Sequence, residues 1–240
     1  MVKPVGLVVG VPTRGKKVAI EWALGFWMQN YPLNTERNIN VVKNKPVDEA
    51  RNQIVKNALD WKAKYIWFLD DDVVAPSFAC RKLMYDLEQA DDDVMVAGGI
   101  YPSKEDIPAP MVFKENGNGP FWKWKANEVF ECEGLGTGCM LIKTEVFAQL
   151  SEPWFKTVDE CPDGGEVVMR RVTDDLYFCK KVVEAGFKII ADGSVICSHW
   201  DYTDDPPKQF LLPKDSYPFK ETEVRTNGQS VATGVSAVAL

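Results

Sequence analysis

The sequence predicts an α/β fold with a mostly parallel sheet flanked by helices and a smaller antiparallel portion. Apolar runs of strand length alternate with helical periodicity over residues 5–97, which implies parallel strands joined by right-handed crossovers. This alternation fails after about Tyr101, because residues 102–130 are rich in Pro, Gly, Asn and Trp and indicate loops and short antiparallel strands. The length of 240 residues suits one domain over 1–225, with halves of about 1–100 and 101–225, and a flexible tail over 226–240.

The first half is expected to contain four strands and three helices. The strands are apolar runs at 5–11, 39–42, 65–69 and 94–97, the last stopped by Gly98-Gly99. The helices have apolar residues at helical spacing and cover 18–28, a segment capped by Asp48, and a segment opened by Pro76-Ser77.

The second half shows fewer regular elements. A strand over 139–142 leads to a short helix capped by Thr144, and 174–185 form a helix that Gly186 closes in a left-handed conformation. The last strands are expected at 188–191 and 195–197.

Charge and cysteine content narrow the functional classes. The chain has 28 basic and 35 acidic side chains, and its formal charge of −7 argues against nonspecific binding to nucleic acid or anionic membrane, while a local basic patch stays compatible. No apolar run approaches the ~20 residues of a membrane span, and the N-terminus is typical of a first strand rather than a signal peptide. Six cysteines without a C-x-x-C pair, most of them in apolar stretches, indicate a reducing, cytoplasmic location.

An acidic triplet follows the third strand. Asp70, Asp71 and Asp72 come directly after residues 65–69, and ligands bind beyond the carboxyl ends of strands in an open parallel sheet. Three neighbouring carboxylates repel one another unless a cation compensates them, and a divalent ion can also bridge to phosphate oxygens. A solvated acidic turn is the alternative, but the position of the triplet directly after a strand favours a binding site for a cation and phosphate oxygens. The triplet 91–93 precedes a strand, so it is expected at the opposite edge as a plain loop.

Two further motifs carry titratable groups. Asp174 and Asp175 open a helix, where carboxylates either cap the helix or, in a site, act as general base or orient an acceptor hydroxyl. The single histidine, His199, follows a strand. It is either a satisfied structural residue or a metal ligand that completes a site with two carboxylates, and having only one histidine argues against a structural zinc site.

A glycine-rich segment, 134–138, precedes a strand. It does not fit the dinucleotide fingerprint, which follows a strand and opens a helix, and the chain has no P-loop sequence. Gly136, Thr137 and Gly138 either let the backbone approach a ligand closely or form a plain turn. Trp122, Trp124 and Trp154 are typical of core packing, with sugar stacking as the less frequent alternative.

Taken in order, these motifs resemble the GT-A glycosyltransferases, in particular the family-2-like group of nucleotide-sugar enzymes, over residues 5–200. The matching parts follow one another along the chain: Pro12-Thr13-Arg14, Ala50-Arg51-Asn52, the D-x-D motif Asp70-Asp71-Asp72, the glycine segment, Asp174-Asp175 and His199. The resemblance implies the GT-A fold, a Rossmann-like sheet whose first half binds the nucleotide-sugar and whose second half lies on the acceptor side.

The resemblance also implies a role for each matching position. Asp72 and His199 bind a divalent metal, Mn²⁺ or Mg²⁺, and Asp70 binds the metal or the ribose. Asp175 is the base of inverting members, with Asp174 where the family usually has Glu. The residues that border the nucleotide-sugar are Pro12, Thr13, Arg14, Arg51 and Asp71, and the acceptor or sugar loop is Gly136, Thr137 and Gly138.

The sequence therefore predicts a metal-dependent glycosyltransferase that moves a sugar from a nucleotide-diphosphate sugar to a hydroxyl acceptor. The acceptor can be a glycan, a small molecule, a protein or a modified nucleic acid base. A sugar-nucleotidyltransferase is one alternative, but residues 11–15 lack its glycine- and lysine-rich phosphate loop. A noncatalytic metal- or sugar-binding module is the other, and it leaves unexplained why acidic residues fall at strand ends and a helix start.

Overall fold

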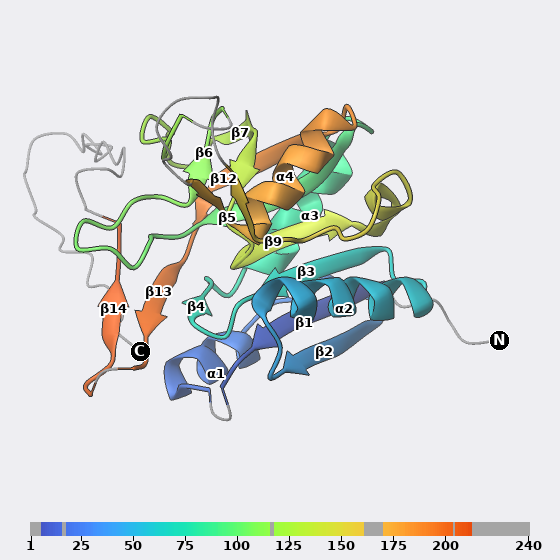
Figure 1. Cartoon of the computed structure of the whole chain (residues 1–240). Coiled ribbons are helices and arrows are strands. Elements are labelled where there is room, and N and C mark those ends of the chain that lie inside the picture. The colour runs from blue at the N-terminus through green and yellow to red at the C-terminus, as the bar shows by residue number, and fades with distance from the viewer. Residues whose placement is uncertain (1–5, 16–17, 116–117, 161–169, 204, 213–240) are drawn as a thin grey trace, which may run out of the picture.

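The computed structural model describes residues 6–15, 18–115, 118–160, 170–203 and 205–212. Its centre is a seven-stranded sheet (Figure 1) in the order β2 (Arg37–Lys43), β1 (Leu7–Thr13), β3 (Tyr65–Leu69), β9 (Cys139–Lys143), β5 (Val94–Ile100), β12 (Lys188–Ile196) and β7 (Val129–Cys132). Only β9 and β7 run antiparallel to their neighbours. The predicted α/β fold with a mostly parallel sheet is confirmed.

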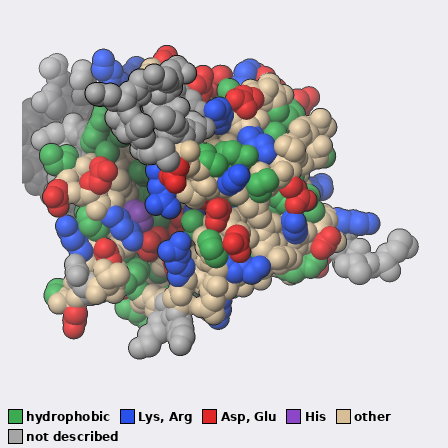
Figure 2. Space-filling view, in the orientation of Figure 1, with side chains coloured by type: hydrophobic (Ala, Val, Ile, Leu, Met, Phe, Trp, Pro, Cys, Tyr) green, Lys and Arg blue, Asp and Glu red, His purple; other side chains and the backbone are tan. Residues whose placement is uncertain are grey.

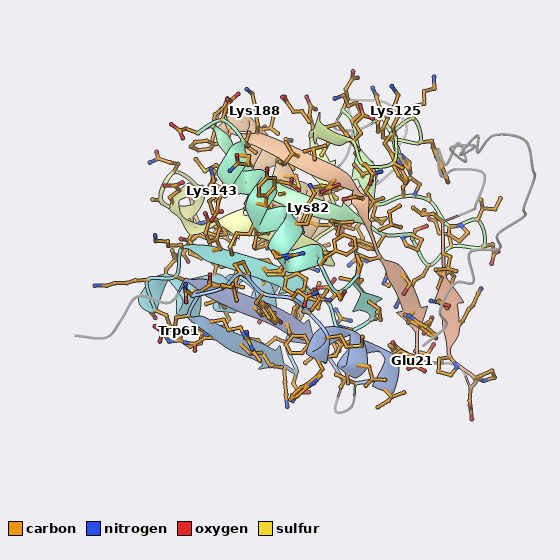
Figure 3. The ribbon with its side chains drawn as sticks, turned by 180° about the vertical axis from the view of Figure 1, so that it is seen from behind. Glu21, Trp61, Lys82, Lys125, Lys143 and Lys188 are labelled. Atoms are coloured by element: carbon orange, nitrogen blue, oxygen red, sulfur yellow. The ribbon has the colours of Figure 1, made fainter. Side chains whose placement is uncertain are left out.

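Helices cover both faces of this sheet and divide its apolar residues into two cores. On one face lie α1 (Ile20–Trp27) and α3 (Ala79–Gln89), which pack Trp22 and Leu83 against Val9. On the other face lie α2 (Val47–Asp60) and α4 (Asp174–Glu184), which pack around Val8 and Phe68. Figures 1 and 3 show these two layers from the front and from behind. Because successive residues along a strand point to opposite faces, the five inner strands β1, β3, β9, β5 and β12 contribute to both cores.

Short antiparallel pairings make up the smaller portion that the sequence predicts. A three-stranded sheet joins β14 (Lys208–Phe210), β13 (Ser198–Asp201) and β4 (Val73–Val74), β6 (Val112–Phe113) pairs with β8 (Gly134–Leu135), and β10 (Val158–Glu160) pairs with β11 (Arg170–Val172). A 3₁₀ helix spans Thr144–Ala148. The β4–β13 pairing places residues 198–199 beside the segment that follows β3. It thereby brings His199 close to the acidic residues at the end of β3.

Several local predictions agree with the structure. The strand at 65–69 has the predicted bounds, Asp91 to Asp93 precede β5 at the edge opposite Asp70, and Gly186 follows α4 with φ of 84°. Five cysteines are buried and free, whereas Cys161 and the predicted tail over 226–240 lie outside the described residues. Within the described ranges, no helix has the length and apolar character needed to cross a bilayer.

Two strand predictions were wrong. β5 does not stop at Gly98-Gly99 but continues to Ile100. The glycines are needed for packing, because a Cβ on Gly99 would lie 2.7 Å from Val195 Cγ1 and one on Gly98 would lie 2.8 Å from Leu135 Cδ1. The two expected last strands are one strand, β12, whose pairing with β5 shifts register between Asp192 and Ile196.

Two predicted helix caps were also wrong. Asp48 lies in the first turn of α2, after Pro46 at the cap position, and its carboxylate accepts a hydrogen bond of 3.3 Å from the Thr157 amide. Thr144 lies inside the 3₁₀ helix, and its hydroxyl donates to the Ala63 carbonyl over 2.5 Å. Both side chains connect distant segments and neither is the N-cap residue of its helix, although Asp48 also accepts a hydrogen bond of 2.9 Å from the adjacent Glu49 amide.

Candidate active site

The carboxyl ends of β1 and β3 border a cavity of about 370 Å³. Parallel neighbours end at the same edge of a sheet, so the segments after these two strands meet there. Figure 2 shows acidic and basic side chains gathered around a hollow on this face. Six predicted site residues line the cavity: Pro12, Thr13, Arg14, Asp70, Asp71 and Asp72.

Thr13 and Asp71 connect the two strand ends. The Thr13 hydroxyl donates a short hydrogen bond to the Asp71 carboxylate and accepts one of 3.1 Å from the Gly15 amide. Burial raises the pKa of Asp71, and the hydrogen bond from Thr13 opposes this effect. This contact fixes one wall of the cavity.

His199 reaches Asp72 through the β4–β13 pairing. His199 lies opposite Val73 in this pairing, and the Trp200 amide donates to the Asp72 carbonyl over 2.8 Å. His199 Nδ1 lies 2.8 Å from the Pro102 carbonyl, which can only accept, so Nδ1 carries a proton. Nε2 faces the Asp72 carboxylate with an N···O distance of 3.4 Å. In the neutral imidazole this nitrogen is a bare acceptor that faces a second acceptor.

A lysine completes the surroundings of Asp72. Lys104 Nζ lies 2.7 Å from Asp72 Oδ2, while His199 faces the other carboxylate oxygen. Burial alone raises the pKa of Asp72, but hydrogen bonding and charge from His199 and Lys104 lower it overall. The carboxylate is therefore held charged at a position that attracts cations.

Asp70 faces a buried arginine instead of His199. Arg51, on α2, donates to both Asp70 oxygens over 2.8 and 3.0 Å and to Asp174 Oδ2 over 2.5 Å. Burial disfavours the charged arginine, but Asp70 and Asp174 outweigh it and raise the pKa of Arg51. Burial raises the pKa of Asp70, and Arg51 opposes this effect. Arg51 thus joins the end of β3 to the start of α4.

The predicted three-residue metal set is consequently only partly assembled. The structure brings Asp72 and His199 together, whereas Asp70 is engaged by Arg51. In the part of the chain that the structure describes, no group of three or more His, Cys, Asp and Glu side chains is arranged to hold a metal. Asp72 and His199 can contribute one oxygen and one nitrogen ligand, the donor types that suit Mn²⁺, and phosphate oxygens and water can supply the others.

Asp174 and Asp175 are both buried at the start of α4 and do not line the cavity. Of the alternatives predicted for Asp174, the helix cap is not found, because its carboxylate pairs with Arg51. Asp175 instead accepts from the Thr173 hydroxyl and, over 2.8 Å, from the Leu176 amide. Burial raises the pKa of Asp175, and the Arg51 charge opposes this effect.

The glycine segment packs against a tyrosine. A Cβ on Gly136 would lie 2.1 Å from the Tyr101 hydroxyl oxygen, and one on Gly138 would lie 2.9 Å from the same ring. The Gly138 amide donates to the Tyr101 hydroxyl over 3.1 Å, and Thr137 is fully buried. The glycines therefore have a packing role, and contact of this segment with a sugar stays a prediction.

Sequence reasoning missed Lys45, Lys104 and Tyr202, which also line the cavity. Lys104 lies in the stretch after Tyr101 that has no helical or strand periodicity, so no residue spacing indicated that it would reach the site. Tyr202 directly follows β13 (Ser198–Asp201), three residues after His199, and this closeness in sequence to the predicted histidine was the available signal.

The chain resembles known proteins in structure and not in sequence. No protein-family model matches it, and no curated protein matches it. The solved structure of A197 from STIV matches with a TM-score of 0.59 and 20% identity, over 87% of this chain and 94% of that chain. GalNAc-T7 with UDP, GalNAc and Mn²⁺ matches with a TM-score of 0.53 and 11% identity, over 82% of this chain and 44% of that chain. Together with the sheet order and helix layers, these matches show that the chain has the GT-A fold.

Proposed function

We propose that the protein is a metal-dependent glycosyltransferase that moves a sugar from a nucleotide-diphosphate sugar to a hydroxyl acceptor. The observation that carries this proposal is the pair formed by Asp72 and His199 beside the cavity. Their facing oxygen and nitrogen, 3.4 Å apart, require a shared proton or a cation, since two bare acceptors repel each other. The Pro102 carbonyl accepts a hydrogen bond from His199 Nδ1 and so fixes the ring with Nε2 toward Asp72, as carbonyl groups commonly do for metal-bound histidines.

Asp72 and His199 are the residues that would hold a divalent ion. Such an ion stabilises the negative charge that develops on a leaving diphosphate. GalNAc-T7, which shares the fold, has been solved with UDP, GalNAc and Mn²⁺. This supports a nucleotide-diphosphate sugar as the donor and Mn²⁺ as the ion in the present protein. Arg14 and Lys45, both exposed at the cavity, add positive charge for the phosphates.

Asp175 is the proposed base. Asp175 is not among the residues that line the cavity, so the acceptor hydroxyl has to enter toward the start of α4. There Asp175 takes its proton while the bond between the anomeric carbon and the diphosphate breaks and the new glycosidic bond forms. A pKa raised by burial suits this task, because a carboxylate with a raised pKa binds a proton more readily. Arg51 positions it indirectly, since it fixes the preceding residue, Asp174, relative to Asp70.

The test is release of nucleoside diphosphate from a panel of uridine, guanosine, adenosine and thymidine diphosphate sugars with Mn²⁺ or Mg²⁺. Release should occur with one donor class, stop in EDTA and return when the ion is restored. Asp72→Asn should abolish it, whereas Asp92→Asn, a matched change in the acidic triplet at the opposite sheet edge, should not. Full turnover in excess chelator would contradict the role of the metal.

The same assay separates the alternatives. A sugar-nucleotidyltransferase would exchange pyrophosphate with a nucleoside triphosphate and would release no diphosphate. A noncatalytic module would show a ligand-dependent rise in melting temperature without release, because any ligand of the native state stabilises it.

A further inference from the structure

Helix α1 is apolar on both its inner and its outer side. Its inner side packs on the sheet: Trp22 is buried, stacks on Phe26 with ring centroids 5.0 Å apart, and Gly25 lies against Val74. Its outer side presents Ile20, Leu24 and Trp27 at i, i+4 and i+7, a single helical stripe. Ile20 is 65% and Trp27 is 85% exposed. A helix on the surface of a soluble domain normally has a polar outer side, and an apolar one indicates burial in another phase or partner.

Further exposed apolar side chains follow this stripe along the chain. Met28 and Leu33 follow α1 and are 63% and 92% exposed. On the edge strand β2, Ile39 and Val41 are exposed and lie opposite Val9 and Val11 in the register with β1. Register partners point to the same face of a sheet, and Val9 and Val11 pack in the core that contains Trp22 of α1.

Ile39 and Val41 therefore lie on the α1 side of the sheet. Figure 3, from behind, shows α3 over the middle of this face and no helix in front of β2. We call this set of residues the α1 surface: Ile20, Leu24, Trp27, Met28, Leu33, Ile39 and Val41. An apolar surface of this extent on a soluble protein marks a site of interaction.

The segment of sequence that contains the α1 surface is basic, although the chain as a whole is acidic. Residues 14–45 contain six basic and two acidic side chains, a net charge of +4, in a chain of net charge −7. Among the described ones, Arg37 and Lys43 are exposed on β2, on the same face as Ile39 and Val41, whereas Arg14 and Lys45 are exposed at the cavity. Arg37 lies with its guanidinium carbon 4.2 Å from the centre of the Tyr31 ring, in the segment that links α1 to β2. Apolar area and positive charge are thus combined in one part of the fold.

We propose that the α1 surface docks the protein on an anionic lipid bilayer. Exposed Trp, Leu and Ile side chains flanked by Lys and Arg are the composition of helices that lie in the membrane interface, where apolar burial and attraction to anionic headgroups act together. A second copy of the chain is a poorer occupant, because two such surfaces would bring their basic side chains together. A helix that lies in the interface with its apolar side chains at the headgroup boundary attaches peripherally and reversibly.

The test is flotation of the full chain with vesicles of phosphatidylcholine alone or with ~30% phosphatidylserine, which supplies the anionic surface. The protein should float with the anionic vesicles, stay behind with the neutral ones, and dissociate as salt is raised. The double variant Leu24→Ser/Trp27→Ser should lower the vesicle partition coefficient by more than about tenfold, because two apolar side chains no longer leave water. Neither residue touches the cavity, so this result does not depend on the proposed transferase activity.

Ile107→Ser is the matched control, since Ile107 is 77% exposed outside the α1 surface, and it should float like the wild type. Equal circular dichroism spectra and melting temperatures of the variants exclude a folding defect. Absence of flotation with anionic vesicles, or flotation that the double variant does not weaken, would overturn the proposal. So would a dimer in sedimentation velocity that Leu24→Ser/Trp27→Ser dissociates, which would assign the surface to a second copy.

Discussion

The guanidinium group of Arg51 donates a hydrogen bond of 2.5 Å to the carboxylate of Asp174, which lies 123 residues further along the chain. The same guanidinium holds Asp70 from its other nitrogen. Both partners of the 2.5 Å bond are nearly inaccessible to solvent, with 5% and 6% of their side chains exposed. One buried cation therefore compensates carboxylates from the D-x-D motif and from the start of α4.

Arg51→Ala should destabilise the fold by about 3–5 kcal/mol, because it leaves the buried Asp174 and the partly buried Asp70 without their cation. Chemical denaturation at pH 7 measures the loss. Lys56→Ala is the control: its ion pair with Glu152 is half exposed, so its loss should cost less than about 1 kcal/mol. Equal losses in the two variants would contradict the importance that we give to the buried pair.

Asp175→Asn and Asp174→Asn should have different consequences. If Asp175 is the base, Asp175→Asn should lower kcat by ~10²–10⁴-fold and leave donor affinity unchanged. Asp174→Asn removes the charge that pairs with Arg51, so its main effect should be on the free energy of unfolding. Steady-state kinetics with the acceptor in hand, combined with denaturation of both variants, measures this difference. Near-normal kcat in Asp175→Asn would contradict its role as the base and leave it only a structural role, through its contacts with Thr173 and Leu176.

Lys104→Met should tighten the binding of Mn²⁺ in the absence of nucleotide. Lys104 Nζ lies 2.7 Å from Asp72 Oδ2, so it competes with any cation for that carboxylate. An ion pair of this partly exposed kind contributes up to about 1 kcal/mol, which corresponds to an affinity gain of up to about fivefold. Isothermal titration calorimetry with Mn²⁺ measures it. Weaker binding in Lys104→Met would show that the lysine supports the ion instead of competing with it.

The parts of the fold that could be predicted from the sequence are those determined by residues close to one another in the chain. The apolar strand 65–69, the acidic residues at its carboxyl end and the helix closed by Gly186 are each encoded within a few neighbouring residues. The alternation of strands and helices then determined which edge of the sheet carries Asp70 to Asp72.

What the sequence could not predict depends on distant partners. Gly98 and Gly99 look like a strand terminator locally, yet their missing side chains make room for Leu135 and Val195. Asp174 looks like a helix cap until Arg51 is placed beside it. No sequence pattern predicts the position of Lys104, because a long loop brings it to Asp72.

The stability of the protein should fall as pH rises from 5 to 8 because of Asp86, on α3. Asp86 and Asp192, on β12, both contact Lys82 Nζ, at 2.5 and 2.6 Å (Lys82 is labelled in Figure 3). Burial, with the hydrogen bond to Asp192, raises the pKa of Asp86 from 3.8 to about 6. Between these values the folded state keeps a proton that the unfolded chain has lost. This contribution is therefore fully present below pH 3.8 and is lost as pH passes 6.

Asp86→Asn should flatten this part of the pH profile, because the amide keeps a donor toward Asp192 and cannot titrate. After allowance for solvent screening, the wild type should lose about 1–2 kcal/mol more than Asp86→Asn between pH 5 and pH 8. Denaturation midpoints of both proteins across that range measure the difference. Asp91→Asn, an exposed change on the loop after the same helix, should follow the wild-type curve. Parallel curves for wild type and Asp86→Asn would show that the proton shared by Asp86 and Asp192 does not contribute to stability, because only titration of Asp86 distinguishes the two proteins in this range.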